Sequence, residues 1–166
     1  MKKLSILAIC VAATSAFAYQ GSTKSTLMGI YNKLDSLSVK KEMTGLTKLL
    51  KQVATKDCFF ITGKGEKQTV EKALSDMSKQ MKVIVKFMNS TTHIDTLTTK
   101  GSMAVARVSS SYKLTSPIDP SGTPHLIESS QVSEDTWVKV GADWKLKSSK
   151  TLKENTKIDG KVVSGM

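Results

Sequence analysis

Apolar side chains follow a helical spacing in three stretches of the first half of the chain, residues 24–37, 43–54 and 70–88. Residues three and four apart lie on one face of a helix, so each stretch predicts an amphipathic helix with one buried side. Thr69 precedes the third stretch and is a favoured N-cap residue. The third apolar stripe continues in register through Val83-Ile84-Val85, so we expect this helix to continue to Met88.

The rest of the chain is rich in β-branched residues and alternates between apolar and polar positions, which predicts strands. A short apolar run at residues 57–62 predicts a buried strand between the second and third helices, followed by a turn at 63–66. Four more strands are expected after the third helix, at residues 91–99, 103–114, 126–140 and 144–152.

The last two strands are separated by the two-residue loop Gly141-Ala142, and glycine at the first loop position suits a type II′ turn. This loop predicts three cross-strand pairs: Val140 with Asp143, Lys139 with Trp144, and Trp137 with Leu146. Trp137 then lies on one face with Trp144 and Leu146. A three-residue loop would instead place Trp137 among exposed lysines.

Helices that precede a run of antiparallel strands define an α+β fold. We expect the N-terminal helices to pack on a curved antiparallel sheet that forms a cone-like cavity. Three segments carry a more specific resemblance: Asp57-Cys58-Phe59, Lys100-Gly101-Ser102-Met103-Ala104-Val105, and Thr136-Trp137-Val138-Lys139 through Trp144-Lys145-Leu146. Over residues 24–152, their order and spacing resemble the nuclear-transport-factor-2-like (NTF2-like) superfamily, in its bacterial SnoaL-like, ketosteroid-isomerase-like branch.

The resemblance implies an apolar cavity between the first helix, the third helix and the concave face of the sheet. Four aromatic residues are our ligand-binding candidates near it: Tyr31, Phe60, Tyr112 and Trp137. Proteins of this superfamily include isomerases, cyclases, dehydratases and many with no known reaction, and they are often dimeric, so a homodimer is compatible with the resemblance. Because one fold hosts many functions, the fold alone does not assign one here.

The first 18 residues predict a secretory signal peptide, with Lys2 and Lys3 before a short apolar run and Ala16-Phe17-Ala18 as the cleavage site. The mature protein is then expected to begin at Tyr19 and to be periplasmic or secreted. The domain would span residues 19–156, followed by a C-terminal tail at 157–166.

Two other readings of this N-terminal segment fit less well. The apolar run is too short for a transmembrane anchor, which needs about 20 residues. A lipoprotein signal ending at Cys10 would require a small residue where Ile9 stands.

The formal net charge is +11, from 25 basic and 14 acidic residues, and it falls to +9 once Lys2 and Lys3 are cleaved. Only Arg107 is an arginine, aromatic residues make up 5%, and the lysines are spread along the chain. Nucleic-acid sites favour arginine and interleaved aromatics, so we expect no nucleic-acid partner. The charge predicts a solvated basic surface, with attraction to anionic envelope polymers as the alternative.

Few residues are marked for chemistry. A ketosteroid-isomerase-like reaction needs a carboxylate base in an apolar pocket and a neutral donor facing the substrate oxygen. Asp57 and Asp95 are the candidate bases, and Tyr31 and Tyr112 the candidate donors, but none lies in a motif that matches the family's catalytic positions. We expect both aspartates to be exposed, since acids are mostly found at the surface.

Histidine and cysteine predict no metal site and no cofactor. His93 is expected on an exposed strand and His125 in a loop, without a spacing diagnostic of metal ligands. Cys58 is the single cysteine of the mature chain and is expected to be a buried free thiol.

We therefore predict an exported, non-catalytic domain that binds a small apolar ligand or a protein partner. The first alternative is an isomerase or lyase of the ketosteroid-isomerase type, which a carboxylate deep in the cone beside Tyr31 or Tyr112 would favour. The second alternative is a basic envelope-associated interaction protein, which a filled cavity and lysines clustered on one face would favour.

Overall fold

The computed structural model describes residues 5–163 and, within them, the side chains of residues 21–163. The predicted signal peptide, residues 1–18, therefore lies outside the described side chains. The elements in chain order are α1 (Ser5–Val39), α2 (Met43–Val53), β1 (Ala54–Ile61), β2 (Lys67–Thr69), α3 (Val70–Val83), β3 (Lys86–Lys100), β4 (Met103–Pro117), β5 (Pro124–Val140), β6 (Asp143–Ile158) and β7 (Lys161–Val163). In this part of the chain, no helix combines the length and apolarity needed to cross a membrane.

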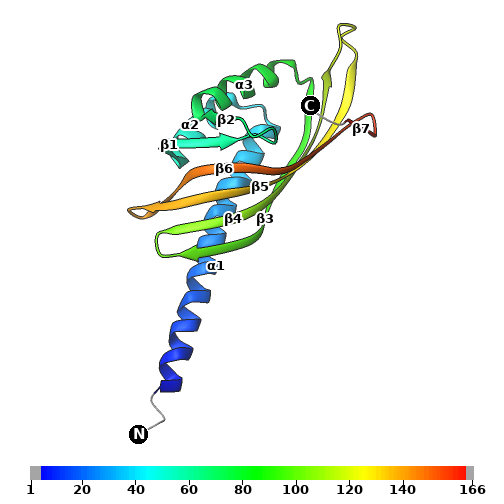
Figure 1. Cartoon of the computed structure of the whole chain (residues 1–166). Helices are drawn as coiled ribbons and strands as arrows, with labels where there is room; N and C mark the ends of the chain where they lie inside the picture. Colours follow the sequence, from blue (N-terminus) through cyan, green and yellow to red (C-terminus); the bar gives the residue numbers. More distant parts are fainter. Residues whose placement is uncertain (1–4, 164–166) are drawn as a thin grey trace.

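The strands form one sheet in the order β2-β1-β6-β5-β4-β3, with β7 paired to β6. In Figure 1, α1 passes behind the curved sheet and α2 and α3 lie together at one end of it. We call the face that α1 covers the inner face and the opposite one the outer face. The expected α+β architecture of helices on a curved sheet is confirmed.

The strand pairing differs from the prediction in one respect. The expected sheet was antiparallel throughout, but β1 runs parallel to β6, with Phe60 opposite Ser149. A helical segment and further strands separate β1 from β6 in the chain, and parallel strands require such a long connection.

The end of α3 is the clearest correction. The helix was expected to reach Met88, but it ends at Val83 and β3 begins at Lys86. The backbone N–H of Val85 donates to the carbonyl oxygen of Thr115 at 2.8 Å, so strand pairing with β4 replaces the next helical turn. Ile84 remains buried, whereas Met88 is 40% exposed. The predicted N-cap is confirmed, because Thr69 Oγ1 accepts a hydrogen bond from Lys72 N at 3.2 Å.

The last hairpin has the predicted register, with Val140 opposite Asp143 and Trp137 opposite Leu146. Gly141 has φ 62°, as the first position of a type II′ turn requires. The sheet also extends beyond the predicted strand end at residue 152. β6 continues to Ile158 and β7 pairs with it, so residues up to Val163 of the expected tail form part of the sheet.

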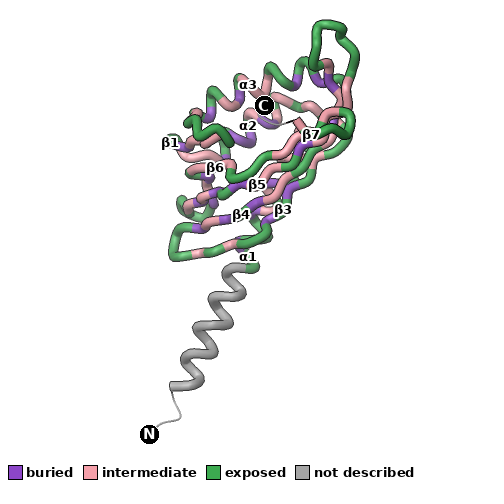
Figure 2. The backbone as a smooth tube through the Cα atoms, turned by 45° about the vertical axis from the view of Figure 1, so that its right-hand side comes forward, coloured by how far each residue is buried: buried purple, intermediate pink, exposed green. Residues whose placement is uncertain are grey.

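Two apolar clusters fill the space between the helices and the inner face. The larger one packs α1 and α2 against β3–β6, and Trp137 and Leu27 in it are 1% and 0% exposed. The smaller one packs Met81 and Ile84 against Leu114. Figure 2 shows this burial along the strands, with exposed residues at the turns. Side chains therefore occupy the interior around Trp137, where the resemblance implied a cavity.

Candidate functional site

A buried polar network lies within the larger apolar cluster. The hydroxyl group of Tyr31, on α1, donates to Asp135 Oδ2 at 2.6 Å. Ser149 Oγ on β6 donates to Asp135 Oδ1 at 2.6 Å, and Trp137 Nε1 donates to the Tyr31 hydroxyl at 3.2 Å. The rings of Tyr31 and Trp137 meet edge to face, with centroids 5.8 Å apart. We call these four residues the core network.

Local sequence places each member of the core network. Asp135 and Trp137 are two residues apart on β5, so both point to the inner face. The β5–β6 ladder has a register irregularity between Thr136 and Trp137. On β6, Ser148 is the partner of Thr136, and Ser149 is the next residue. Tyr31 belongs to the buried stripe of α1 that also contains Leu27, one helical turn before it. The helix thus places the hydroxyl group of Tyr31 next to the carboxyl group of Asp135, which is 104 residues later in the chain.

Burial dominates the electrostatics of this network. It raises the pKa of Asp135, while hydrogen bonds from Ser149, Tyr31 and Ser133 act in the opposite direction. Burial, together with the neighbouring Asp135, also raises the pKa of Tyr31. Tyr31 therefore stays protonated, and the carboxyl group has a shifted affinity for its proton. A raised carboxyl pKa in an apolar site is a property that acid–base enzymes use.

The core network is closed and its hydrogen-bonding capacity is already used. Tyr31, Asp135 and Trp137 are 7%, 5% and 1% exposed. The one proton of the Tyr31 hydroxyl is directed at Asp135, so it does not point at a substrate oxygen. Both carboxyl oxygens accept hydrogen bonds. In this conformation the network fastens α1 to the sheet.

An open groove lies where α1 crosses the edge strand β3. It has a volume of about 380 Å³ and is lined by Met28, Val39 and Asp35 from α1 and by Thr92 and His93 from β3, among others. Asp35 Oδ1 accepts hydrogen bonds from Ser90 Oγ at 2.6 Å and from Thr92 Oγ1 at 3.0 Å. We call this hollow the α1–β3 groove.

Met28 connects the α1–β3 groove to the core. It lines the groove and also packs against the apolar cluster that contains Tyr31 and Trp137. Methionine has three rotatable bonds and adapts to irregular spaces. Met28 is therefore a side chain shared by the α1–β3 groove and the apolar cluster.

The structure places the four predicted ligand-binding residues in two regions. Tyr31 and Trp137 are in direct contact, and half-buried Phe60 packs against the same cluster. Tyr112 is 36% exposed and makes its ring contact with Phe87 at 6.0 Å. Tyr112 therefore lies apart from the other three.

The two predicted candidate bases are at the surface, as expected. Asp57 is exposed and pairs with Lys147 at 3.7 Å. Asp95 is exposed and accepts a hydrogen bond from Ser109 Oγ at 2.6 Å. His93 is also exposed, on β3. Neither aspartate is in an apolar environment that would suit a catalytic base, and His93 lines the open α1–β3 groove.

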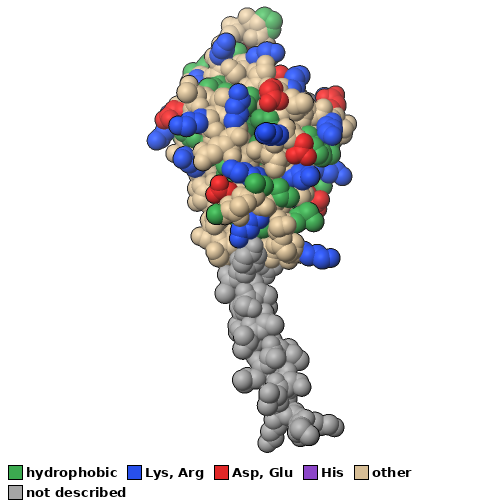
Figure 3. Space-filling model, turned by 90° about the vertical axis from the view of Figure 1, so that its left-hand side faces the viewer, with side chains coloured by type: hydrophobic (Ala, Val, Ile, Leu, Met, Phe, Trp, Pro, Cys, Tyr) green, Lys and Arg blue, Asp and Glu red, His purple; other side chains and the backbone are tan. Residues whose placement is uncertain are grey.

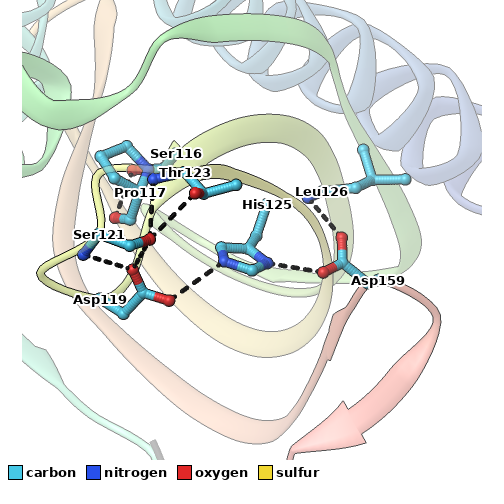
Figure 4. A network of polar contacts seen from close by, with 8 residues as sticks. All are labelled: Ser116, Pro117, Asp119, Ser121, Thr123, His125, Leu126 and Asp159. Atoms are coloured by element: carbon cyan, nitrogen blue, oxygen red, sulfur yellow. Dashed lines mark hydrogen bonds and ion pairs between the residues drawn. The ribbon is translucent and has the colours of Figure 1, made fainter.

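His125 was expected in a loop but lies in β5, between two carboxylates (Figure 4). Its Nδ1 is 2.7 Å from Asp159 Oδ2, and its Nε2 is 3.4 Å from Asp119 Oδ2. Asp159 also accepts a hydrogen bond from Leu126 N at 2.9 Å. The hydrogen bond to Asp159, aided by the negative charge of both carboxylates, raises the pKa of His125. This arrangement links the β4–β5 loop to the β6–β7 turn.

Cys58 is a free thiol and 5% exposed, as predicted. Burial is the largest of the effects that raise the pKa of Cys58 to about 11, so the thiol stays protonated at neutral pH and is a poor nucleophile. Among the described residues, no group of three or more His, Cys, Asp or Glu side chains is arranged to hold a metal ion.

Sequence reasoning missed Asp135. The signal was present, because Ser133, Asp135 and Trp137 alternate along one strand and Trp137 was predicted to be buried. The same alternation places Asp135 on the buried face. Its partner Tyr31 could not be inferred from the sequence, because the position of α1 along the sheet depends on tertiary packing.

Comparisons with known proteins define the class of fold. No protein-family model matches the chain, and no curated protein matches its sequence. A conserved protein from Planctomyces limnophilus has a similar structure, with 14% identity, a TM-score of 0.66 and coverage of 78% of this chain and 94% of that one. An NTF2-like superfamily protein from Salmonella enterica has 16% identity and a TM-score of 0.57, covering 88% and 96%.

A hexachlorocyclohexane dehydrochlorinase is also similar in structure, with 10% identity, a TM-score of 0.53 and coverage of 87% and 91%. The neighbours thus include an enzyme as well as proteins described only by their fold. This chain has the NTF2-like fold, as the sequence resemblance predicted. At these identities the likeness establishes the fold and not a reaction.

Proposed function

We propose that this protein is an exported, non-catalytic binding protein that holds a small, mainly apolar molecule in the α1–β3 groove. The proposal rests on the location of Met28, whose side chain lines the groove and also packs against the apolar core. Ligand sites are typically concave and apolar with few polar groups, and here Asp35 and His93 supply polar atoms.

The state of the core network supports a non-catalytic role. Catalysis would need a base or donor that a substrate can reach, whereas Tyr31 and Asp135 bind one another and are nearly inaccessible. When Met28 moves aside, a ligand reaches the edge of the cluster that contains Tyr31, Phe60 and Trp137. Tyr31, on the same helix as Met28, is the predicted residue that such a ligand would approach, whereas Phe60 lies on β1, four strands from β3 in the sheet.

Export is part of this proposal and rests on the N-terminal sequence. Mass spectrometry of the protein recovered from the producing cell's envelope or medium should show a chain that begins at Tyr19. A chain that begins with a lipid-modified Cys10 would contradict the proposal and indicate a membrane-anchored lipoprotein.

Binding can be measured with the neutral fluorescent dye N-phenyl-1-naphthylamine. We expect saturable enhancement of its fluorescence with the mature protein, and at least a tenfold loss of affinity in Met28→Trp, whose larger side chain fills the groove. Met103→Trp is the matched control, because Met103 is an exposed methionine on the sheet and does not line the groove. Equal affinity of the two variants would refute the assignment of the site.

An isomerase or lyase of the ketosteroid-isomerase type is the second candidate. Asp135 favours it, because this carboxyl group has a raised pKa beside Tyr31 in the apolar core. The test is turnover of a panel of hydrophobic carbonyl compounds by the mature protein. Activity that disappears in Asp135→Asn but persists in Asp95→Asn would establish the enzyme and refute the non-catalytic proposal.

A basic interaction protein of the envelope is less well supported. On the face shown in Figure 3, lysine and arginine side chains are dispersed, with acidic side chains between them. That face therefore does not present the concentrated positive charge that this alternative requires.

A further inference from the structure

A second hollow lies on the outer face of the sheet and borders the α1–β3 groove, because Thr91 and His93 line both. Two adjoining depressions, of about 320 and 270 Å³, share Ser111, Ser130 and Asn155 in their linings. They lie on strands β3–β6, whose outer face is turned toward the viewer in Figure 1. We call them together the outer hollow.

A row of hydroxyl and amide side chains crosses the floor of the outer hollow. Thr91 pairs with Ser111, Ser111 with Ser130, and Ser130 with Asn155, so one polar residue follows another across four neighbouring strands. The hydroxyl groups of Thr91 and Ser111 are 3.0 Å apart and exposed. Neighbouring strands are about 4.8 Å apart, so hydrogen-bonding groups repeat at a spacing comparable with the length of one pyranose ring.

Lysines surround this row. Lys113, Lys153 and Lys157 line the outer hollow together with one acidic residue, Glu128, so the lining has a net charge of +2. Lys113 pairs with Glu128 at 2.8 Å. Among residues 21–163, Lys153 and Lys157 take part in no ion pair. Lys157 lies opposite Glu128 on the neighbouring strand, and its charge helps to lower the pKa of that carboxyl group. Both ammonium groups can still contact a ligand.

The polar row and the lysines around it favour some classes of ligand over others. The polar row itself contains no aromatic residue, and Tyr112, which borders it, makes its ring contact with Phe87, so the row offers no stacking platform for successive nucleobases. Val132 is the one aliphatic residue among those that line the outer hollow, so an apolar partner would bury little apolar side-chain surface there. Two copies of the chain that met through this face would bring their lysines together, and like charges at an interface oppose association. A ligand that carries both hydroxyl groups and negative charge complements the floor and the rim at once.

We propose that the outer hollow binds an acidic oligosaccharide with carboxylate groups. Ser111, Ser130 and Asn155 hydrogen-bond the sugar hydroxyls, and Lys153 and Lys157 bind the carboxylates. None of the residues assigned to this ligand lines the α1–β3 groove, so either proposal can fail without the other.

The test is isothermal titration of the mature protein with tetragalacturonate. Two ligands of the same length separate the contributions: a neutral galactotetraose tests hydroxyl recognition alone, and an acetylated tetraglutamate tests charge alone. We expect tetragalacturonate to bind at least tenfold more tightly than either. Exposed charge contacts are individually weak, and the loss of two of them in Lys153→Gln/Lys157→Gln should lower its affinity about tenfold.

Two further variants identify the site. Lys72→Gln/Lys79→Gln changes the net charge equally, on α3, and should leave the affinity unchanged. Ser111→Ala/Ser130→Ala should weaken tetragalacturonate binding and leave tetraglutamate binding unaffected. Absence of binding, equal affinity for tetraglutamate, or an equal loss in the α3 variant would overturn the proposal. A dimer in sedimentation equilibrium that Ser130→Trp dissociates would also overturn it, because the second copy would occupy the face.

Discussion

Removal of the Tyr31 hydroxyl group tests the core network most sharply. Tyr31→Phe keeps the ring and its edge-to-face contact with Trp137, and removes one oxygen that takes part in two hydrogen bonds. The side-chain volume hardly changes, so cavity formation contributes little to the result. The measured loss therefore reports on polar contacts.

The magnitude follows from the two contacts. Loss of the Tyr31–Asp135 hydrogen bond should cost about 1–2 kcal/mol, since a hydrogen bond contributes about 1 kcal/mol and more when its partner is charged. The indole N–H of Trp137, which is 1% exposed, loses its acceptor, and an unsatisfied buried donor costs about 1–3 kcal/mol. Together the free energy of unfolding should fall by about 2–5 kcal/mol, which corresponds to a Tm decrease of roughly 6–15 °C for a domain of this size.

Urea denaturation followed by tryptophan fluorescence measures the loss, and Tyr112→Phe is the matched control. Tyr112 is 36% exposed, so its hydroxyl deletion should change the free energy of unfolding by less than about 0.5 kcal/mol. If the two variants lose the same small amount, Tyr31 does not hold Asp135 and Trp137 in the way described here.

The stability of Asp135→Asn as a function of pH tests the raised pKa of Asp135. The raised pKa means that the folded protein binds more protons than the unfolded chain at pH values above the unfolded aspartate pKa of 3.8. Wild-type stability attributable to this group is therefore present at low pH and is lost as the pH rises through the raised pKa. The asparagine variant should gain stability relative to wild type across that interval, and a constant difference would contradict the burial of a titrating carboxyl group.

Three further predictions concern other parts of the molecule. Trp137→Ala should cost about 3–5 kcal/mol in urea denaturation, as for other large buried aromatics, and a loss under about 1 kcal/mol would refute its burial. Cys58 should react with a thiol reagent only at the rate of unfolding, and rapid labelling of the native protein would contradict its burial. Compared with His125→Gln, the wild type should have its greatest advantage in Tm between about pH 4 and 6.5. The raised pKa of His125 means that its ion pairs stabilise the fold fully below the unfolded histidine pKa of 6.5, and this stabilisation is lost as the pH rises above it. The lowered pKa values of Asp119 and Asp159 mean that these carboxylates contribute fully only above the unfolded aspartate pKa of 3.8. A Tm difference that does not depend on pH would exclude the ion pairs.

Features that depend only on neighbouring residues, such as a hairpin register or a helix N-cap, could be predicted from the sequence. A two-residue loop fixes the register of its hairpin, so the pairing of Trp137 with Leu146 followed from Gly141-Ala142. The N-cap at Thr69 followed in the same way from side-chain chemistry.

Prediction failed where two local rules compete or where distant segments meet. Val83-Ile84-Val85 fits a helical stripe and is also β-branched, and only pairing of Val85 with Thr115 decides for the strand. The core network needs α1 placed over β5 at one particular position, which no local pattern encodes. The core network was therefore only partly predictable, because the burial of Trp137 followed from the hairpin register, whereas Asp135 and its contact with Tyr31 did not.

Entry of a small apolar ligand at Met28 can be tested directly by methyl NMR. In the mature protein labelled with 13C at methionine methyl groups, titration with N-phenyl-1-naphthylamine should shift the Met28 signal in proportion to saturation. The signals of Met88 and Met103, which lie outside the α1–β3 groove, should stay in place. Saturable dye binding that leaves the Met28 signal unmoved would contradict the account.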